Sequence, residues 1–251
     1  MTPKIRNAKL NKSRRQELFE QGVQFLHEKD YEDAYTFFLE AAQNNHAKST
    51  YELGLLYIYG FYPERNYEKG FHYLNLSLEL GEKGFYEDLM DVEDELIEKK
   101  DKEGIQYLRN YLEHMLNKGS MEAAIYIGDR YANGTLYEKN AEMAIHYYKL
   151  AAESGINMGY ECLGEMYYLG EIVTKDYKKA YEYLTAFDGE CSYLKLYYLG
   201  EMYRFGQYVA EDAKKAEKYF RRIVESENPV CEDMFYGLAK KSLERMRGNN
   251  L

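Results

Sequence analysis

Residue types that do chemistry in enzymes are present in this sequence, but their spacing matches no catalytic or metal-binding motif. The five histidines, His27, His46, His72, His114 and His146, have neither the HExxH spacing nor the cysteine partner of common zinc sites. The three cysteines are irregularly spaced and include no CxxC pair, which favours reduced thiols over a disulfide framework or a zinc site. No GxSxG, Walker or GxGxxG motif occurs. The sequence therefore predicts no catalytic residue, no cofactor and no metal.

The overall charge restricts the classes of partner. The chain has 43 acidic and 33 basic residues and a net charge of −10. A surface this acidic repels phosphate backbones, so nucleic-acid binding is disfavoured. No stretch approaches the roughly 18 apolar residues of a membrane-spanning helix, and no apolar run near the N-terminus suggests a signal peptide. We therefore expect a cytoplasmic protein that binds neither nucleic acid nor membranes.

The N-terminal segment is an exception to this acidity. Before Glu17 there is no acidic residue, and the basic residues there are Lys4, Arg6, Lys9, Lys12, Arg14 and Arg15. We favour a solvated basic arm that leads into the first helix over an arm that grips an acidic partner.

A 36-residue period runs through the sequence. The segments IGDRYANG, LGEMYYLG and LGEMYRFG align without a gap, and their inner glycines Gly128, Gly164 and Gly200 are 36 residues apart. An earlier copy, LGLLYIYG, contains Gly54, and the interval from Gly54 to Gly128 fits two repeats with one of them degenerate. A second position of the same period holds a small residue, and this small-residue slot is filled by Ala34, Gly70, Ala144, Ala180 and Ala216. Such periods are typical of helical-repeat arrays.

An Asp or Asn stands four residues before each small-residue slot. These residues are Asp30, Asn66, Asn140, Asp176 and Asp212. The side-chain oxygen of Asp or Asn accepts a hydrogen bond from a free N–H of the first helical turn, so each is predicted to cap a helix. Asp101 is expected to do the same in the degenerate repeat. Six caps predict six helical hairpins.

The repeated motif also predicts local packing. In LGxxY the Leu and the Tyr are four residues apart and share one helical face, which we expect to point into the core. The inner glycine lies within a helix, where Gly costs about 1 kcal/mol relative to Ala, so we expect close approach of a neighbouring helix, packed through its small-residue slot. The closing glycine of each copy should end the helix in the left-handed conformation. The closing glycines are Gly60, Gly134, Gly170 and Gly206.

These spacings divide the chain into parts. We predict a basic arm at 1–13, a hairpin at 14–45, a repeat array at 46–226, and a C-terminal capping helix with a tail at 227–251. The interval from Gly22 to Ala34 is four residues shorter than its counterpart in the four recognisable copies, so the first turn should be shorter by the same amount. The third unit, 83–118, keeps helical periodicity without the inner glycine, and its acidic side chains, which include Glu93 and Glu95, are predicted to be solvated.

The residues quoted above resemble the Sel1-like repeat, whose pattern pairs a Leu-Gly-x-x-Tyr helix with an Ala- and Tyr-rich one. The best copy is MGYECLGEMYYLGEIVTKDYKKAYEYLTAF, and matches extend over about residues 46–226. The first unit, LFEQGVQFLHEKDYEDAYTFFLEAA, is more similar to a tetratricopeptide repeat. Both resemblances imply an all-α fold, a right-handed superhelical α/α solenoid of about six helix-turn-helix repeats with a C-terminal capping helix. They also imply a non-catalytic scaffold or adaptor that holds a partner protein.

Two departures from the family pattern bear on this expectation. A position that the family often fills with Ala holds Ser49, Ala123, Gly159 and Lys195, so packing between repeats should vary. One branch of the family has a disulfide in each repeat, and the paired cysteines of that branch are missing here. Any extracellular or enzymatic role of that branch is therefore disfavoured.

A candidate binding strip follows from the resemblance, which implies that the first helix of each pair lines a concave groove. The side of that helix opposite the Leu and Tyr falls two residues before and two and five residues after the Leu. From these positions we select as protein-binding residues Tyr51, Asp129, Glu161, Glu165, Tyr168, Tyr197, Glu201 and Arg204. Carboxylates among tyrosines could hold a Lys- or Arg-bearing segment. The competing interpretation is that they are ordinary solvated residues.

The earliest repeat differs from the others along this strip because its residues there are apolar. Tyr51, Leu55 and Ile58 are predicted either to pack on the N-terminal hairpin or to form an exposed hydrophobic patch.

Four functions compete. The first is an intracellular scaffold that binds a protein or peptide, with a basic partner suited to the acidic chain. The second is a regulatory, effector or immunity-type protein that acts through a basic partner. An RNA-binding helical repeat needs a basic groove, and a hydrolase of the cysteine-rich branch needs paired cysteines, so both are disfavoured.

Overall fold

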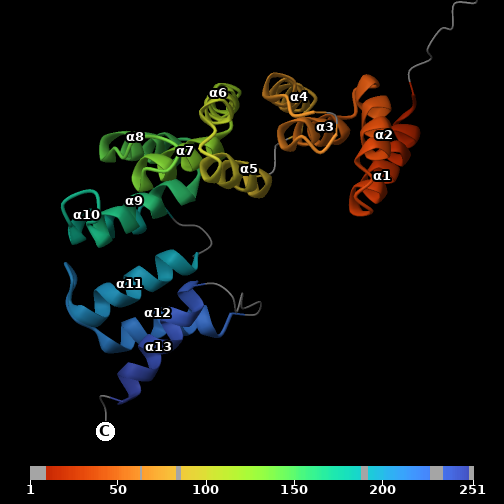
Figure 1. Cartoon of the computed structure of the whole chain (residues 1–251). Helices are drawn as coiled ribbons and strands as arrows, with labels where there is room; N and C mark the ends of the chain where they lie inside the picture. The colour runs from red at the N-terminus through yellow and green to blue at the C-terminus, as the bar shows by residue number, and fades with distance from the viewer. Residues whose placement is uncertain (1–9, 63, 83–85, 188–191, 227–233, 249–251) are drawn as a thin grey trace, which may run out of the picture. The chain divides into compact units, whose positions relative to one another are not determined.

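The computed structural model describes residues 10–62, 64–82, 86–187, 192–226 and 234–248, and in these ranges all regular secondary structure is helical (Figure 1). The basic residues Lys4, Arg6 and Lys9 of the predicted arm, and Cys191 and Cys231, lie outside the described residues. The first six helices are α1 (Lys12–His27), α2 (Tyr31–Gln43), α3 (Ala47–Tyr59), α4 (Tyr67–Glu79), α5 (Tyr86–Glu98) and α6 (Lys102–Asn117). The others are α7 (Met121–Asn133), α8 (Ala141–Glu153), α9 (Asn157–Leu169), α10 (Tyr177–Leu184), α11 (Tyr193–Phe205), α12 (Ala213–Val224) and α13 (Met234–Gly248).

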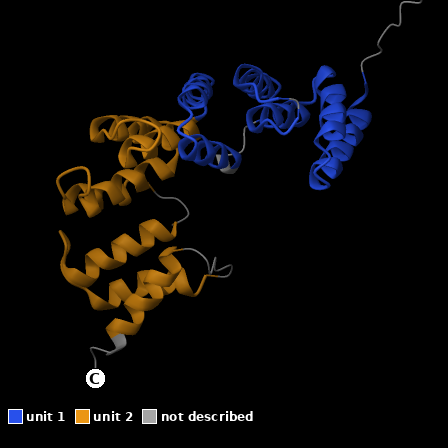
Figure 2. Cartoon of the chain, viewed as in Figure 1, with its two compact units in different colours: residues 1–120 blue, residues 121–251 orange. Residues whose placement is uncertain are grey.

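The chain divides into two compact units, residues 1–120 and 121–251 (Figure 2). Unit 1 contains the hairpins α1–α2, α3–α4 and α5–α6, and unit 2 contains α7–α8, α9–α10 and α11–α12 together with α13. The predicted all-α helical-repeat fold is confirmed, with the six predicted hairpins among the described residues. In unit 2, α13 packs on α11 and α12, where Ala239 and Leu243 join the cluster of Leu196, Phe220 and Ile223.

All six predicted helix caps are confirmed. Asp30, Asn66, Asp101, Asn140, Asp176 and Asp212 each accept a hydrogen bond from the backbone N–H three residues later. Some first helices are capped as well, since the side chains of His46 and Ser192 accept from the N–H of Ser49 and Lys195. His46 therefore has a structural role as a helix cap, which its isolated position in the sequence did not indicate.

The turns within the hairpins have two lengths. Seven residues separate the helices in the second, fourth, fifth and sixth hairpins, and each of these turns begins at a closing glycine with a positive φ, as in Gly60 at 69°. Three residues separate α1 from α2, so the predicted shorter first turn is confirmed. The third hairpin also has a three-residue turn, and both short turns place a lysine in the left-handed region, Lys29 at φ 61° and Lys100 at φ 54°.

Each inner glycine makes room for a large side chain of the second helix. A Cβ built on Gly128 would lie 2.6 Å from the Tyr148 ring, and one on Gly200 would lie 2.6 Å from the Phe220 ring. The contact residue lies four positions past the small-residue slot. The slot residue also packs on the inner glycine in two hairpins, where the backbone oxygens of Gly70 and Ala180 would lie 2.9 and 3.4 Å from a Cβ on Gly54 and Gly164. In all five glycine-bearing repeats the contact residue is bulky, namely Phe38, Leu74, Tyr148, Leu184 and Phe220. The Ala slots are themselves fully buried.

A stacked tyrosine pair recurs in the long-turn hairpins and accounts for part of the high tyrosine content. The Tyr of LGxxY stacks on a tyrosine of the second helix with ring centroids 5.7–5.8 Å apart and planes within 13° of parallel. The pairs are Tyr57–Tyr73, Tyr131–Tyr147, Tyr167–Tyr183 and Tyr203–Tyr219. Offset stacking of this kind adds about 0.5–1.5 kcal/mol to the burial of the two rings, so each pair helps to hold its hairpin closed.

Packing between neighbouring hairpins varies, as the departures at the family's Ala position predicted. A Cβ on Gly159 of α9 would lie 2.5 Å from the backbone oxygen of Tyr148 and 2.6 Å from the backbone nitrogen of Ala152, so α8 and α9 meet backbone to backbone. At the equivalent position of α11, Lys195 is buried and its ammonium donates to the Phe187 carbonyl at 2.8 Å.

The third hairpin corrects one expectation about its acidic residues. Glu93 is 2% exposed and Glu95 is half-buried, so the prediction that the acidic side chains of this unit are solvated is wrong for these two. For Glu95 the cause is tertiary, because Arg65 of the preceding hairpin pairs with it at 2.6 Å. Gly104 of α6 takes over the role of the missing inner glycine, since a Cβ there would lie 2.3 Å from Leu96 of α5.

Candidate protein-binding strip

Three carboxylates occupy the position directly after the inner glycine in the hairpins of unit 2. They are Asp129 on α7, Glu165 on α9 and Glu201 on α11, one in each repeat, and each is half-buried. We call these three residues the acidic strip. α9 and α11 contact each other directly, and Asp129 and Glu165 line the same cleft, so the strip is continuous within unit 2.

Each carboxylate of the acidic strip is hydrogen-bonded, but by different donors. The Tyr148 hydroxyl donates to Oδ1 of Asp129 at 2.7 Å, and the Tyr198 hydroxyl donates to Oε1 of Glu165 at 2.6 Å. Oε1 of Glu201 accepts from the Ser242 hydroxyl at 3.1 Å and from the Arg204 guanidinium at 3.3 Å. Two carboxylates are therefore held by neutral hydroxyls and only the third by a cation.

The electrostatics of Asp129 and Glu165 differ from those of Glu201, which has an ion pair with Arg204. Burial raises the pKa of both carboxyls. The tyrosine hydrogen bonds, and for Asp129 also the nearby charge of Arg130, offset only part of that effect. Among the described residues, no basic side chain forms an ion pair with either of them. These two carboxylates keep their charge at a cost in free energy that a cation brought close to them would reduce.

A cleft of about 320 Å³ opens at these two residues. Its polar lining includes Asp129, Glu165, Lys139 and Glu171, and its apolar lining includes Met166, Leu169 and Ile172. The Cys162 thiol also faces it, and burial together with the nearby carboxylates raises the pKa of that thiol, so it stays protonated. Apolar walls with carboxylates among them suit the aliphatic stem and charged head of a lysine or arginine side chain.

The structure places the eight sequence-predicted residues in different environments. Tyr51 lies in unit 1 and the other seven lie in unit 2. The expectation of exposed side chains is wrong for Tyr51, which is 1% exposed, and for Glu161, which is 3% exposed. The Tyr51 hydroxyl donates to Asp88 of α5 at 3.2 Å, so a neighbouring hairpin covers it. Burial raises the pKa of Glu161, which hydrogen-bonds Ser192 at the start of α11.

The two tyrosines predicted to offer ring faces have those faces partly occupied. Tyr168 packs on Tyr198 and Tyr177 with centroid distances of 4.6 and 5.3 Å. Tyr197 packs on Phe220 and Phe235 at 5.9 and 5.6 Å. Both remain half-buried rather than fully buried. Only part of each ring face is therefore open to a ligand.

The apolar residues of the earliest repeat form no exposed patch. Tyr51 and Ile58 are both buried, which excludes that alternative. Ile58 packs on the second helix of its own hairpin, where a Cβ on Gly70 would lie 2.6 Å from its side chain. The second helix of its own hairpin therefore covers Ile58, in addition to any cover from the N-terminal hairpin.

Sequence reasoning missed Tyr148 and Tyr198, which hold the strip carboxylates, and Cys162. Tyr198 immediately precedes the Leu of LGxxY, and the same position holds Glu52, Tyr126 and Cys162 in the other copies. A position that changes in this way from copy to copy gives no repeating signal, so only the folded structure identifies these partners.

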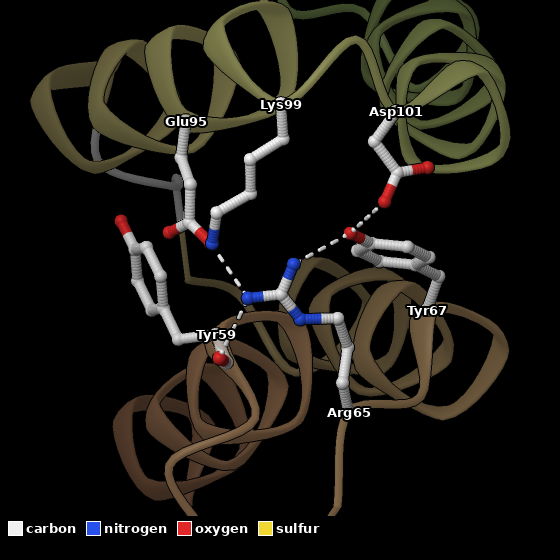
Figure 3. A network of polar contacts seen from close by, with 6 residues as sticks. All are labelled: Tyr59, Arg65, Tyr67, Glu95, Lys99 and Asp101. Carbon is white, nitrogen blue, oxygen red and sulfur yellow. Dashed lines mark hydrogen bonds and ion pairs between the residues drawn. The ribbon is translucent and has the colours of Figure 1, made fainter.

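A second polar network lies in unit 1 and joins its second and third hairpins (Figure 3). The Arg65 guanidinium donates to Oε1 of Glu95 at 2.6 Å, to the Tyr59 carbonyl at 2.9 Å and to the Tyr67 hydroxyl at 3.0 Å. The Tyr67 hydroxyl donates onward to Asp101 at 2.7 Å, and Lys99 also pairs with Glu95. Every charge in this network meets an opposite charge or a hydrogen-bond partner, so it connects hairpins and leaves no charge for a ligand.

The described residues contain no group of three or more His, Cys, Asp or Glu side chains arranged to hold a metal ion. No described helix is both long and apolar enough to span a bilayer.

Comparison with known proteins agrees with this architecture. The model of the Sel1 repeat family matches residues 17–46, 47–82, 122–156, 158–186 and 196–227, which together are more than half of the chain. The matches include the first hairpin, whose shorter turn resembles a tetratricopeptide repeat, and leave out the third hairpin. No curated protein matches the chain.

Solved structures share the fold at low sequence identity. A Sel1 repeat protein from Oxalobacter formigenes is 19% identical with a TM-score of 0.52, over 96% of this chain and 91% of that one. The protective antigen c5321 of uropathogenic Escherichia coli is 20% identical with a TM-score of 0.53, over 84% of this chain. This chain spans only 46% of the length of c5321. From the repeated motifs, the helical hairpins and the family model that matches them, we conclude that the chain belongs to the Sel1 repeat family.

Proposed function

We propose that this protein is a non-catalytic interaction scaffold whose acidic strip binds a basic segment of a partner protein. Sel1-repeat proteins are generally interaction scaffolds, which supports the first half of the proposal. The observation that carries the second half is the pair Asp129 and Glu165, which are half-buried in the lining of one cleft and form no ion pair with a described basic side chain.

The energetics of that pair favour a basic ligand. Each carboxylate uses one oxygen for a tyrosine hydroxyl, and the other oxygen has no hydrogen bond within the described part of the chain. A guanidinium or ammonium in the cleft would supply charge-assisted hydrogen bonds to these oxygens. Because burial has already removed part of the water around the carboxylates, the added desolvation on binding is small.

Further along the strip, Glu201 is already paired with Arg204, so we assign it a lesser share of the binding energy. The same contact would serve a regulatory, effector or immunity-type role, because each of these would act through a basic partner. A cytoplasmic location is part of the proposal and is supported by the absence of paired cysteine spacings in the sequence and by the free thiol of Cys162.

The test compares two variants of equal net charge. Asp129→Asn with Glu165→Gln removes both strip charges, whereas Glu142→Gln with Glu211→Gln removes two exposed charges elsewhere in unit 2. Cross-linked partners are captured from host lysate with each variant, and an arginine-containing peptide from the captured partner is titrated calorimetrically. We expect the native protein and the control to bind and the strip variant to lose about tenfold or more in affinity.

Proton linkage provides a second readout of the same site. A cation bound at the cleft stabilises the charged carboxylates, so binding should release protons and weaken as pH falls through their raised pKa values. Equal affinity of the strip variant and the native protein, with no proton release, would place the partner on another surface.

A further inference from the structure

One helix of unit 2 departs sharply from the acidity of the chain. α12 carries five basic residues and a single acidic one, Glu217, in a protein of net charge −10. Three of the basic residues, Lys214, Lys218 and Arg222, are spaced four apart and therefore lie on one face, about 6 Å from one to the next along the helix axis. All three are exposed. We call these three residues the basic ridge.

The basic ridge is unpaired where its neighbours on the same helix are paired. Arg221 forms ion pairs with Glu217 at 2.7 Å and with Glu225 at 2.8 Å, and the Lys215 ammonium donates to the Tyr203 hydroxyl at 2.7 Å. In the described part of the chain, no carboxylate pairs with the three ridge residues. Like charges four apart on a helix cost about 0.2–0.5 kcal/mol per pair, so the ridge lowers the stability of α12.

No other second helix of a glycine-bearing hairpin carries such a row. Counted from the helix cap, the ridge positions are two, six and ten residues on. The matching residues are Lys178, Glu182 and Ala186 in and just after α10, Glu142, His146 and Leu150 in α8, Glu68, His72 and Leu76 in α4, and Glu32, Thr36 and Glu40 in α2. In α10 the one basic residue at a ridge position, Lys178, forms an ion pair with Glu182 at 3.9 Å. The repeat fold therefore does not require cations at these positions.

The surface around the ridge has room for a ligand. Two shallow hollows of about 580 and 380 Å³ lie along α12, and both are lined by Lys214, Lys218 and Arg222. The apolar face of the same helix is fully buried in the core through Ala216, Phe220 and Ile223. Because that face is occupied, α12 cannot insert into a bilayer as an interfacial amphipathic helix does.

We propose that the basic ridge docks an acidic segment of a partner protein. Carboxylates spaced about 6 Å apart match the ridge, and side chains four apart on a helix or two apart in an extended strand have this spacing. A nucleic acid fits less well. The ridge is only about 12 Å long, so the phosphates beyond its ends would meet the surface of an acidic protein and be repelled. The ridge lies on a second helix and the acidic strip on first helices, so the two surfaces can take different partners.

The experiment uses a fluorescent peptide with Glu at alternate positions, and its Gln counterpart as a blank, in anisotropy titrations with the full-length protein. The ridge variant carries Lys214→Gln, Lys218→Gln and Arg222→Gln. The control variant removes three exposed cations from other second helices of unit 2, Lys149→Gln, Lys178→Gln and Lys179→Gln. Hydrogen exchange of α12 verifies that each variant is folded.

We expect the acidic peptide to bind the native protein and the control with equal affinity, and the ridge variant about tenfold or more weakly, with a reduced dependence on salt. Equal binding to all three proteins, or tighter binding of single-stranded DNA or phosphatidylserine vesicles than of the peptide, would overturn the proposal. So would a native dimer in sedimentation that the ridge variant loses, because the occupant would then be a second copy. The ridge variant should still bind basic partners at the acidic strip, so failure here is separable from failure of the proposed function.

Discussion

The Arg65 network of unit 1 and the acidic strip of unit 2 both place carboxylates where one hairpin meets the next, but they neutralise them differently. Burial alone would raise the pKa of Glu95, and the hydrogen bonds and charges of Lys99 and Arg65 outweigh it and hold that pKa below its usual range. Asp129 and Glu165 are hydrogen-bonded by tyrosine hydroxyls and form no ion pair with a described residue. Burial raises the pKa of both, although the charge of Arg130 lowers that of Asp129 in part. The neighbouring charge, more than burial, decides which carboxylates are already satisfied and which can gain from a ligand.

The two junctions also differ in how closely the backbones approach. Polar side chains join α3–α4 to α5–α6 in unit 1, whereas α8 and α9 in unit 2 meet backbone to backbone at Gly159. Unit 1 should therefore be sensitive to loss of a cation at its junction, and unit 2 to an added methyl group.

The largest expected effect is that of Gly159→Ala. The new methyl group would press on two backbone atoms of α8, which cannot move aside as a side chain can. We expect unit 2 to lose about 3 kcal/mol, the upper part of the range for overpacking, with faster hydrogen exchange in α8 and α9. Gly237→Ala in α13 is the matched control, since a Cβ there meets nothing within 4 Å and the change should stabilise the helix by up to about 1 kcal/mol. Equal effects of the two substitutions would contradict the close contact.

Arg65→Ala should have the next largest effect. It leaves Glu95 half-buried beside Lys99 alone and removes the donor to the Tyr59 carbonyl. Hydrogen bonds to charged groups contribute about 1.5–3 kcal/mol, so we expect a loss of about 2 kcal/mol in unit 1, seen as reduced exchange protection in α3–α6. Arg14→Ala removes an exposed pair with Glu17 and should change stability by less than about 0.5 kcal/mol. If both substitutions were equally mild, the network would not hold the hairpins together.

Glu52 tests whether the pKa of a carboxylate depends on a neighbouring cation or on the unit in which it lies. It lies in unit 1, but no described cation pairs with it, and burial with nearby Asp88 and Glu82 raises its pKa to about 7. Its folded pKa exceeds the unfolded one, so the native state binds the extra proton, and the Glu52 carboxylate destabilises the fold above pH 7 but not below the unfolded pKa. Glu52→Gln should therefore stabilise the protein by about 1 kcal/mol at pH 8. The gain is smaller than the pKa shift of Glu52 implies, because the buried amide also needs hydrogen-bond partners. Thermal unfolding at pH 8 and pH 4.5 measures the difference, which should vanish at the lower pH.

Glu165→Gln should have the smallest effect. The amide oxygen can still accept from Tyr198, and the charge penalty of the buried carboxylate is removed. The pKa of Glu165 is raised in the fold, so its charge destabilises the protein once the pH exceeds the unfolded pKa. We expect a gain of less than about 0.5 kcal/mol at pH 8 and none at pH 4. The pH dependence from Glu95 has the opposite sign, because its lowered pKa gives stability that is lost as pH falls through that value. A loss of stability for Glu165→Gln at pH 8 would remove the contrast between the two regions.

The sequence by itself determined the features that depend on interactions within a few residues. The helix caps such as Asp30 and Asn140, the left-handed turn glycines, the shorter first turn and the six hairpins all follow from local hydrogen bonding and backbone freedom. The motifs that repeat every 36 residues indicated the family, and the resemblance to that family implied the general position of the strip. Each of these signals repeats, so each could be checked against other copies in the same chain.

Only the tertiary structure decided which strip residues are accessible and how each is neutralised. Tyr51 and Glu161 occupy positions equivalent to those of the half-buried Ile125 and Tyr197, but they are buried because elements of the next hairpin cover them. The bond from Tyr198 to Glu165 links residues 33 positions apart on different repeats, at a position whose residue type varies among the copies. Burial, pKa and the presence of a cleft depend on what the neighbouring repeat places against a side chain, and a repeating pattern specifies the contacts within a repeat far better than the contacts between repeats.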